Sequence, residues 1–241
     1  MVRGASALLA ATTVALAYAL AAGSLPDLGD GDAAILVASG VGLLAVSALT
    51  LAVAGTCDSL VTAALLAIGG GLLMGALDDA GLDSAAIVPE AIFAGAFGVL
   101  LARWLLAYAG PAVALAVPVF VALVDVWSVV LGPTSRLADG DPRGAAALAF
   151  DLPSWGGALA GPAARLGLPD AIFLAAFATW ALRLDLRPRL TTVTMVCGLL
   201  ATMIVSITTD RTIPALPLLV AGFLLPNADR LGALLRDPGR R

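Results

Sequence analysis

Long runs of apolar residues recur along this chain, and short stretches rich in polar residues, Gly or Pro separate them. A run of roughly 18 apolar residues can cross a hydrocarbon layer about 30 Å thick, because a helix rises about 1.5 Å per residue. The pattern therefore predicts an all-α fold, a polytopic membrane helix bundle of about eight transmembrane helices. The expected spans lie near residues 5–22, 33–54, 59–77, 85–102, 105–131, 164–182, 190–207 and 212–225.

The first apolar run has two interpretations. Arg3 precedes a stretch that ends in Ala19-Leu20-Ala21, as in a secretory signal with small residues before its cleavage site. The uncharged run is longer than the usual signal core of about 7 to 15 residues, which favours a retained helix. Residues 1–22 are thus read as the first span, with a cleaved signal as the alternative.

One connection is much longer than the others, from residue 132 to residue 162. Long connections in compact proteins are often functional. Its stretch at 145–150 and Trp155 are apolar enough to lie at the membrane interface or over the bundle, and a plain linker explains them equally well. The chain is accordingly divided into N-terminal transmembrane helices (1–109), a second half with the candidate chemistry (110–229) and a short Arg-containing tail (230–241).

Composition supports membrane residence and excludes several function classes. The chain is 61% hydrophobic and only 12% charged, whereas soluble domains have about 25% charged residues. Acidic residues outnumber basic ones by four, which excludes a nucleic-acid-binding footprint. Because His is absent, Ser-His and Cys-His nucleophiles are excluded as well. Cys57 and Cys197 are too few for a metal cage, so no cofactor or metal is expected.

All basic residues are Arg, and an acidic, Lys-free, Ala-rich chain is typical of haloarchaeal-type proteins. The positive-inside rule orients eight spans with both termini in the cytoplasm and the 132–162 loop outside the cell membrane. One side then carries nine arginines, namely Arg3, Arg103, Arg183, Arg187, Arg189, Arg230, Arg236, Arg240 and Arg241. The other side carries Arg136, Arg143, Arg165 and Arg211.

Asp125 is the clearest candidate functional residue. It lies inside an apolar run, about six residues before the expected outer end of its helix. A charge in the membrane interior costs at least about 2.5 to 3.5 kcal/mol, so such a residue usually serves a function. A carboxyl that is hydrogen-bonded for packing is the alternative.

Two further motifs are expected at the same depth. Asp170 follows Gly167-Leu168-Pro169 at the start of the next span, and the long outer loop makes this helix antiparallel to that of Asp125. Alone, Asp170 would be read as an N-terminal helix cap. Pro214-Ala215-Leu216 begins the last span, and prolines there loosen the helix into backbone suited to a substrate-binding wall.

This order of motifs resembles the presenilin and signal peptide peptidase family of intramembrane aspartyl proteases. The family has Tyr-Asp, Gly-x-Gly-Asp and Pro-Ala-Leu where this chain has Val124-Asp125, Gly167-Leu168-Pro169-Asp170 and Pro214-Ala215-Leu216. The resemblance covers roughly residues 111–226, and the chain is one helix shorter than the family. It implies a presenilin-like fold, Asp125 and Asp170 as the catalytic pair, and substrate binding at Pro214, Ala215, Leu216, Gly167 and Leu168.

The sequence therefore predicts an intramembrane aspartic endopeptidase whose substrates are transmembrane helices or signal-peptide remnants in the lipid bilayer. Two neighbouring carboxyls cannot both ionise cheaply, so they would share one proton and activate water as a pair. Two alternatives remain. An ion- or proton-coupled transporter also uses buried aspartates, and in a catalytically inactive membrane scaffold they would only bind neighbouring helices.

Overall fold

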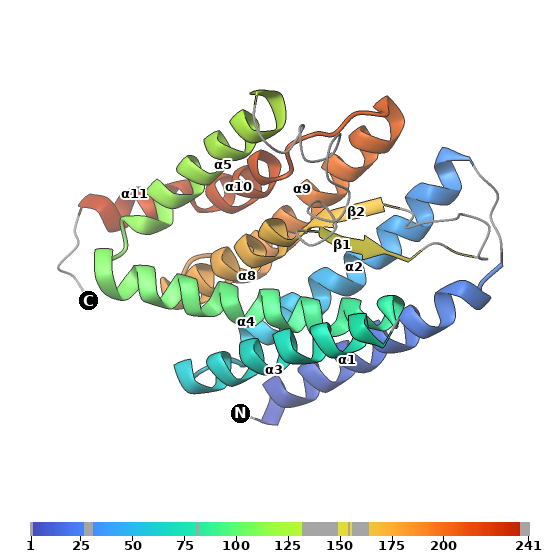
Figure 1. The fold of residues 1–241 in the computed structure, drawn as a ribbon. Helices are drawn as coiled ribbons and strands as arrows, with labels where there is room; N and C mark the ends of the chain where they lie inside the picture. The colour runs from blue at the N-terminus through green and yellow to red at the C-terminus, as the bar shows by residue number, and fades with distance from the viewer. Residues whose placement is uncertain are drawn as a thin grey trace.

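A computed structural model describes residues 2–26, 31–80, 82–131, 149–153, 155 and 164–236. The chain folds mainly into helices (Figure 1). The helices are α1 (Val2–Ala21), α2 (Asp32–Thr56), α3 (Leu60–Asp79), α4 (Asp83–Ala109), α5 (Val113–Leu131), α8 (Leu168–Arg183), α9 (Pro188–Thr209), α10 (Leu216–Leu224) and α11 (Ala228–Arg236), with short 3-10 turns at Ala22–Ser24 and Leu225–Asn227. Two strands, β1 (Ala149–Leu152) and β2 (Ala164–Gly167), form an antiparallel pair.

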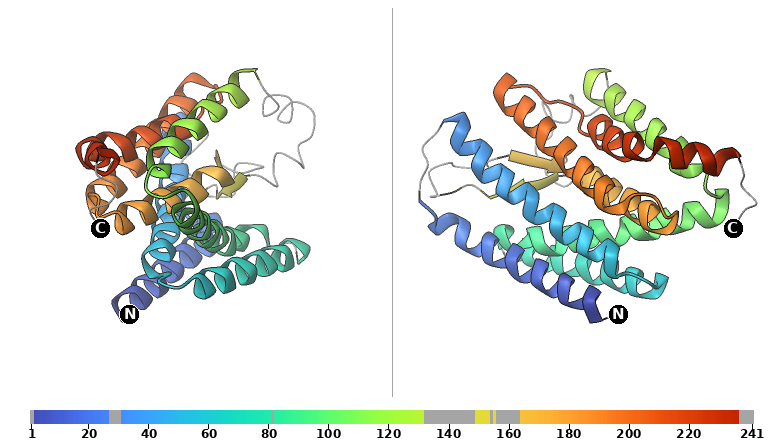
Figure 2. Two further views of the ribbon diagram at one scale, coloured as in Figure 1. Left: turned by 90° about the vertical axis from the view of Figure 1, so that its left-hand side faces the viewer. Right: turned by 180° about the vertical axis from the view of Figure 1, so that it is seen from behind.

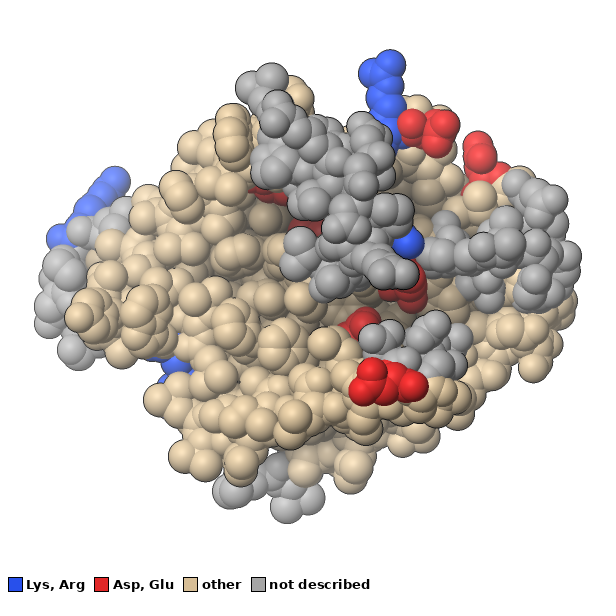
Figure 3. Space-filling view, viewed as in Figure 1, with Lys and Arg blue, Asp and Glu red and all other residues tan. Residues whose placement is uncertain are grey.

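Within the described residues, six helices are long and apolar enough to cross a membrane: α1, α2, α3, α4, α5 and α9. The protein is therefore a multi-pass membrane protein with a helical bundle. The other two of the eight expected spans are shorter, since α8 has 16 residues and α10 has 9. Uncharged residues make up most of the face seen in Figure 3, as expected for a surface that contacts lipid.

The centre of the bundle is formed by α2, α4 and α8, which all pack on one another. α1 and α3 cover α4 on one side, while α9 and α10 lie on the other and α5 packs on α10 at the edge (Figures 1 and 2). Trp180 of α8 is fully buried, and its indole N–H donates to the Ala102 carbonyl of α4 at 2.9 Å. The segments 1–109 and 110–229 thus share one core.

Glycines allow several helices to cross with their backbones in contact. A Cβ on Gly222 of α10 would lie 2.6 Å from the Thr194 carbonyl of α9, and one on Gly198 of α9 would lie 2.6 Å from the Leu218 carbonyl of α10. On α3, Gly70 fits against α4, where a Cβ would be 2.9 Å from the Pro89 carbonyl. Within the glycine-rich stretch of α3, Gly70 therefore makes the close contact with α4.

A polar network joins the α8–α9 turn to the end of the chain. Asn227 is fully buried, accepts from the Arg187 backbone N–H at 2.9 Å and donates to the Thr191 hydroxyl at 2.7 Å. The Arg187 guanidinium also donates to the Pro226 carbonyl and binds both carboxylate oxygens of Asp229. These hydrogen bonds hold the pKa of the exposed Asp229 carboxyl below its usual range. Part of the predicted tail, 230–236, therefore belongs to the ordered helix α11.

The start of the sixth expected span is corrected by the structure. Residues 164–167 form strand β2 paired with β1, and helix α8 begins only at Leu168. Residues 164–167 can form a strand because β1 supplies its pairing partner. Ala149 to Leu152 pair with Gly167 to Ala164 in antiparallel register. The fold is thus helical with one added hairpin.

The described parts of the long connection pack on the bundle. Phe150 and Leu152 of β1 are buried, and the Trp155 indole donates to the Tyr18 hydroxyl of α1 at 3.2 Å. Residues 149–152 and 155 are therefore a segment packed on the bundle and not a plain linker, the two interpretations that the sequence left open. Most of the predicted loop, with Arg136 and Arg143, and the tail residues Arg240 and Arg241 lie outside the described residues.

Candidate functional site

The three sequence motifs lie at the same end of the bundle. Asp125 is six residues before the end of α5, Asp170 is the third residue of α8, and Leu216 is the first residue of α10. α10 packs on both α5 and α8, so it joins the two helices that carry the aspartates. In Figures 1 and 2, α5 runs alongside α10.

Asp125 is held by the backbone of the third motif. Its Oδ2 accepts a hydrogen bond from the Leu216 backbone N–H at 3.0 Å. The first N–H groups of a helix have no partner within that helix, and residue 217, a proline, has no N–H at all. Asp125 therefore caps α10 from a different helix, which is possible because the chain at Pro214 and Ala215 is not helical.

The Asp170 side chain lies at the N-terminus of its own helix, α8. Gly167 is the N-cap of α8, and its backbone N–H interacts with the Asp170 carboxyl three residues later, in the arrangement of a capping box. Pro169 lies in the first turn, where a missing N–H costs nothing. A proline at position 169 is thus compatible with the start of this helix.

The two aspartates also affect each other. The Asp170 carboxyl lies within electrostatic range of the Asp125 carboxyl, although the residues are on helices that are far apart in sequence. Neither residue is exposed and neither is fully buried. The structure therefore places Asp125, Asp170 and Leu216 near one another at one partly accessible end of the bundle.

Gly167 leaves room for the Asp170 carboxyl. A Cβ on residue 167 would be 2.8 Å from Asp170 Oδ2 and 3.4 Å from its Cγ. The backbone there has a φ of −60°, which any residue adopts, so the glycine is not needed for its conformational freedom. Its lack of a side chain matters only for the position of the carboxyl.

The hairpin leads directly into this site. β2 ends at Gly167, and Leu168, partly buried, is the first residue of α8. Arg165 of β2 pairs with Asp151 of β1 at 2.8 Å, which links the two strands beyond their backbone bonds. An isolated pair of strands has outer edges that can accept a further strand. This element was missed from the sequence, because 164–167 merges with the apolar run that follows.

No protein-family model, curated protein or solved structure matches this chain. Its function is therefore inferred from the residues of the site and their geometry.

We expect Gly167→Ala to impair any chemistry at Asp170 without unfolding the protein. The methyl group would displace the Asp170 carboxyl, and a shift of about 1 Å in a reacting group can cost roughly a hundredfold in rate. Turnover of a substrate helix should fall by roughly tenfold to a hundredfold, while the thermal midpoint in detergent stays close to that of the parent protein. Unchanged turnover would show that the position of this carboxyl does not matter.

Proposed function

We propose that this protein is an intramembrane aspartic endopeptidase that uses Asp125 and Asp170 as its catalytic pair. The observation that carries the proposal is the hydrogen bond from the Leu216 N–H to Asp125, which joins two separate motifs, with Asp170 of the third motif within electrostatic range of the same carboxyl. The resemblance to the presenilin and signal peptide peptidase family supports it, with this chain as a short and divergent member.

The reaction follows from two carboxyls that share one proton. The ionised carboxyl takes a proton from a water molecule as the water oxygen attacks the scissile carbonyl. The protonated carboxyl donates to the carbonyl oxygen as negative charge develops there. When the tetrahedral intermediate collapses, the C–N bond breaks and the amine takes the proton that came from the water. One hydroxyl of the intermediate returns its proton to the ionised aspartate, which restores the pair and leaves a carboxylic acid on the other fragment.

The proposed substrate is a transmembrane helix. Its peptide bonds are protected by internal hydrogen bonds, so it must unwind before cleavage. The unwound strand needs backbone partners in a medium without water, and two elements beside the aspartates offer them. These are the non-helical segment at Pro214 and Ala215 and the outer edge of the β1–β2 hairpin.

A direct assay tests this proposal. The purified chain, reconstituted in phospholipid vesicles with a fluorescent transmembrane reporter helix, should release two fragments whose masses define a single cut within the span. An inhibitor that mimics the tetrahedral intermediate of aspartic proteases should block release and label the protein. If the reporter stayed intact after long incubation and the labelled inhibitor did not bind, the proposed endopeptidase activity would be ruled out.

The transporter alternative is kept because partly buried aspartates also relay ions. The Leu216–Asp125 contact disfavours it, since the hydrogen bond holds one carboxyl oxygen on a helix terminus. A transporter would move ions or protons into sealed vesicles without cutting the reporter, and a scaffold would do neither.

We also propose that both termini lie in the cytoplasm. Among the described residues, Arg103, Arg183, Arg187 and Arg230 gather at one end of the bundle, where they bind the Asp58 carbonyl, Asp229 and the Asp185 carbonyl. The positive-inside rule assigns this end to the cytoplasm and the aspartate end to the outer face of the cell membrane.

A further inference from the structure

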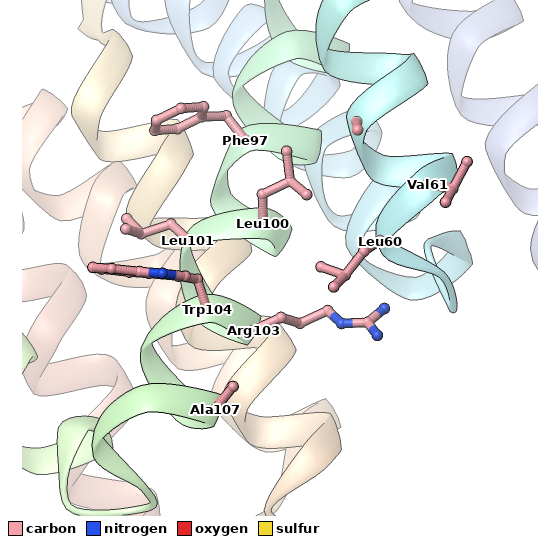
Figure 4. A pocket seen from close by; sticks show the side chains of 9 residues that line it. Leu60, Val61, Phe97, Leu100, Leu101, Arg103, Trp104 and Ala107 are labelled. Carbon is pink, nitrogen blue, oxygen red and sulfur yellow. The ribbon is translucent and has the colours of Figure 1, made fainter.

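An apolar cleft of about 650 Å³ lies between the start of α3 and the second half of α4 (Figure 4). It is at the opposite end of the bundle from the aspartates, because α4 ends where α5 begins and Asp125 is near the end of α5. Its walls are made by Leu60, Val61, Ala64, Phe97, Leu100 and Trp104, and Arg103 is its charged lining residue. An open cleft with such walls on the side of a membrane bundle faces lipid.

Two arginines meet at one end of this cleft. Figure 4 shows the Arg103 side chain running from α4 towards the start of α3. Its guanidinium donates to the Asp58 carbonyl at 2.7 Å, and the guanidinium of Arg183, the last residue of α8, reaches the same oxygen at 3.5 Å. The two positive groups therefore lie close together at the mouth of an apolar cleft.

Neither arginine forms an ion pair with an acidic side chain in the described part of the chain. There, ion pairs join Arg165 to Asp151 and Arg187 to Asp229, and neither involves Arg103 or Arg183. The bond to Asp58 uses a backbone oxygen, and each guanidinium has five N–H groups, so donors remain for another ligand. Two adjacent cations of this kind match a phosphate group.

Aromatic side chains indicate the depth of this site. Trp104 and Tyr108 are exposed on α4, and their rings pack 5.8 Å apart, one helical turn from each other. Exposed Trp and Tyr side chains concentrate at the level of the lipid headgroups. Because Arg103 directly precedes Trp104, a Trp104 at headgroup level would place the Arg103 guanidinium at the depth of the phosphates, with the cleft extending towards the acyl chains.

We propose that this cleft binds an anionic phospholipid. Arg103 and Arg183 bind the headgroup phosphate, and an acyl chain lies along the cleft between α3 and α4. A zwitterionic lipid such as phosphatidylcholine would gain the same apolar contacts and also carries a phosphate, but its ammonium group cancels the negative charge. The preference for a headgroup with net negative charge therefore comes from the two arginines. The inference does not depend on the proposed protease activity.

Lipid retention by the full chain tests the proposal. The protein is purified in neutral detergent, supplied with phosphatidylglycerol or phosphatidylcholine of identical acyl chains, and examined by native mass spectrometry. We expect phosphatidylglycerol to be retained at least about tenfold better, since each interfacial arginine favours an anionic surface by roughly five- to tenfold. The double variant Arg103→Gln/Arg183→Gln should lose this preference.

Two further variants separate the parts of the site. Arg189→Gln removes an exposed arginine of α9 outside the cleft and should leave the preference unchanged. Ala107→Trp adds bulk at an exposed lining position and should reduce retention of both lipids. Equal retention of the two lipids, or a preference that survives in the double variant, overturns the proposal. So does equally strong binding of soluble glycerol phosphate, which would define a site for a free anion.

Discussion

Asp125→Asn and Asp170→Asn are each expected to abolish cleavage of the reporter helix while the protein stays folded. The amide is close in size to the carboxyl, and its oxygen can still accept the Leu216 N–H at position 125 or cap α8 at position 170. It cannot exchange the proton that the mechanism requires. Initial rates of fragment release in vesicles should fall by at least about a thousandfold in each variant.

The double variant distinguishes a working pair from two independent groups. Residues that act as one unit are not additive, so Asp125→Asn/Asp170→Asn should be no slower than either single change. Thermal midpoints close to the parent value would show that the hydrogen bonds survive. Retained turnover in either folded single variant would remove that aspartate from the mechanism and return Asp170 to a simple helix cap.

Gly222→Ala is expected to be the most damaging of the small changes away from the aspartates. The new methyl group would meet backbone atoms of Thr194 and Met195 at 2.6 to 2.7 Å, and backbone cannot move aside as a flexible side chain does. Overpacking of this kind costs about 1 to 3 kcal/mol. It also forces α10 away from α9 and so displaces the Leu216 N–H from Asp125, which should lower cleavage together with stability.

A glycine in open surroundings provides the matched control. Gly75 is in helix α3, and a Cβ there would have no neighbour within 4 Å. Gly75→Ala should therefore leave denaturation in mixed micelles unchanged or raise stability slightly, since alanine favours a helix over glycine by up to about 1 kcal/mol. If both variants denatured alike, the tight crossing of α9 and α10 would not limit stability.

The helical bundle could be predicted because lipid allows few alternatives. A membrane span must satisfy all its backbone groups internally, so apolar length predicts α1, α2, α3 and α9 nearly residue by residue. The boundary between α4 and α5 was placed too early, before residue 105, whereas α4 continues to Ala109. The turn at Gly110 and Pro111 ends α4. Neither residue is polar, so the turn does not interrupt the apolar run in the sequence.

The site was predictable to the extent that charge in an apolar run is conspicuous. Asp125 and Asp170 stood out for this reason, and antiparallel helices required them to lie at one level. The hairpin did not stand out, because Ala149 to Leu152 and Ala164 to Gly167 pair over a distance in sequence and carry no strong alternation. The close crossing of α9 and α10 at Gly198 and Gly222 was also missed, because a glycine in a membrane helix does not indicate which helix packs against it.

The bond between the Leu216 N–H and Asp125 makes the two oxygens of this carboxyl unequal. The N–H engages a lone pair of Oδ2 and stabilises negative charge there, so a proton is favoured on the other oxygen of Asp125 or on Asp170. In the proposed mechanism, a single main-chain amide would in this way bias an otherwise symmetric pair before any substrate arrives.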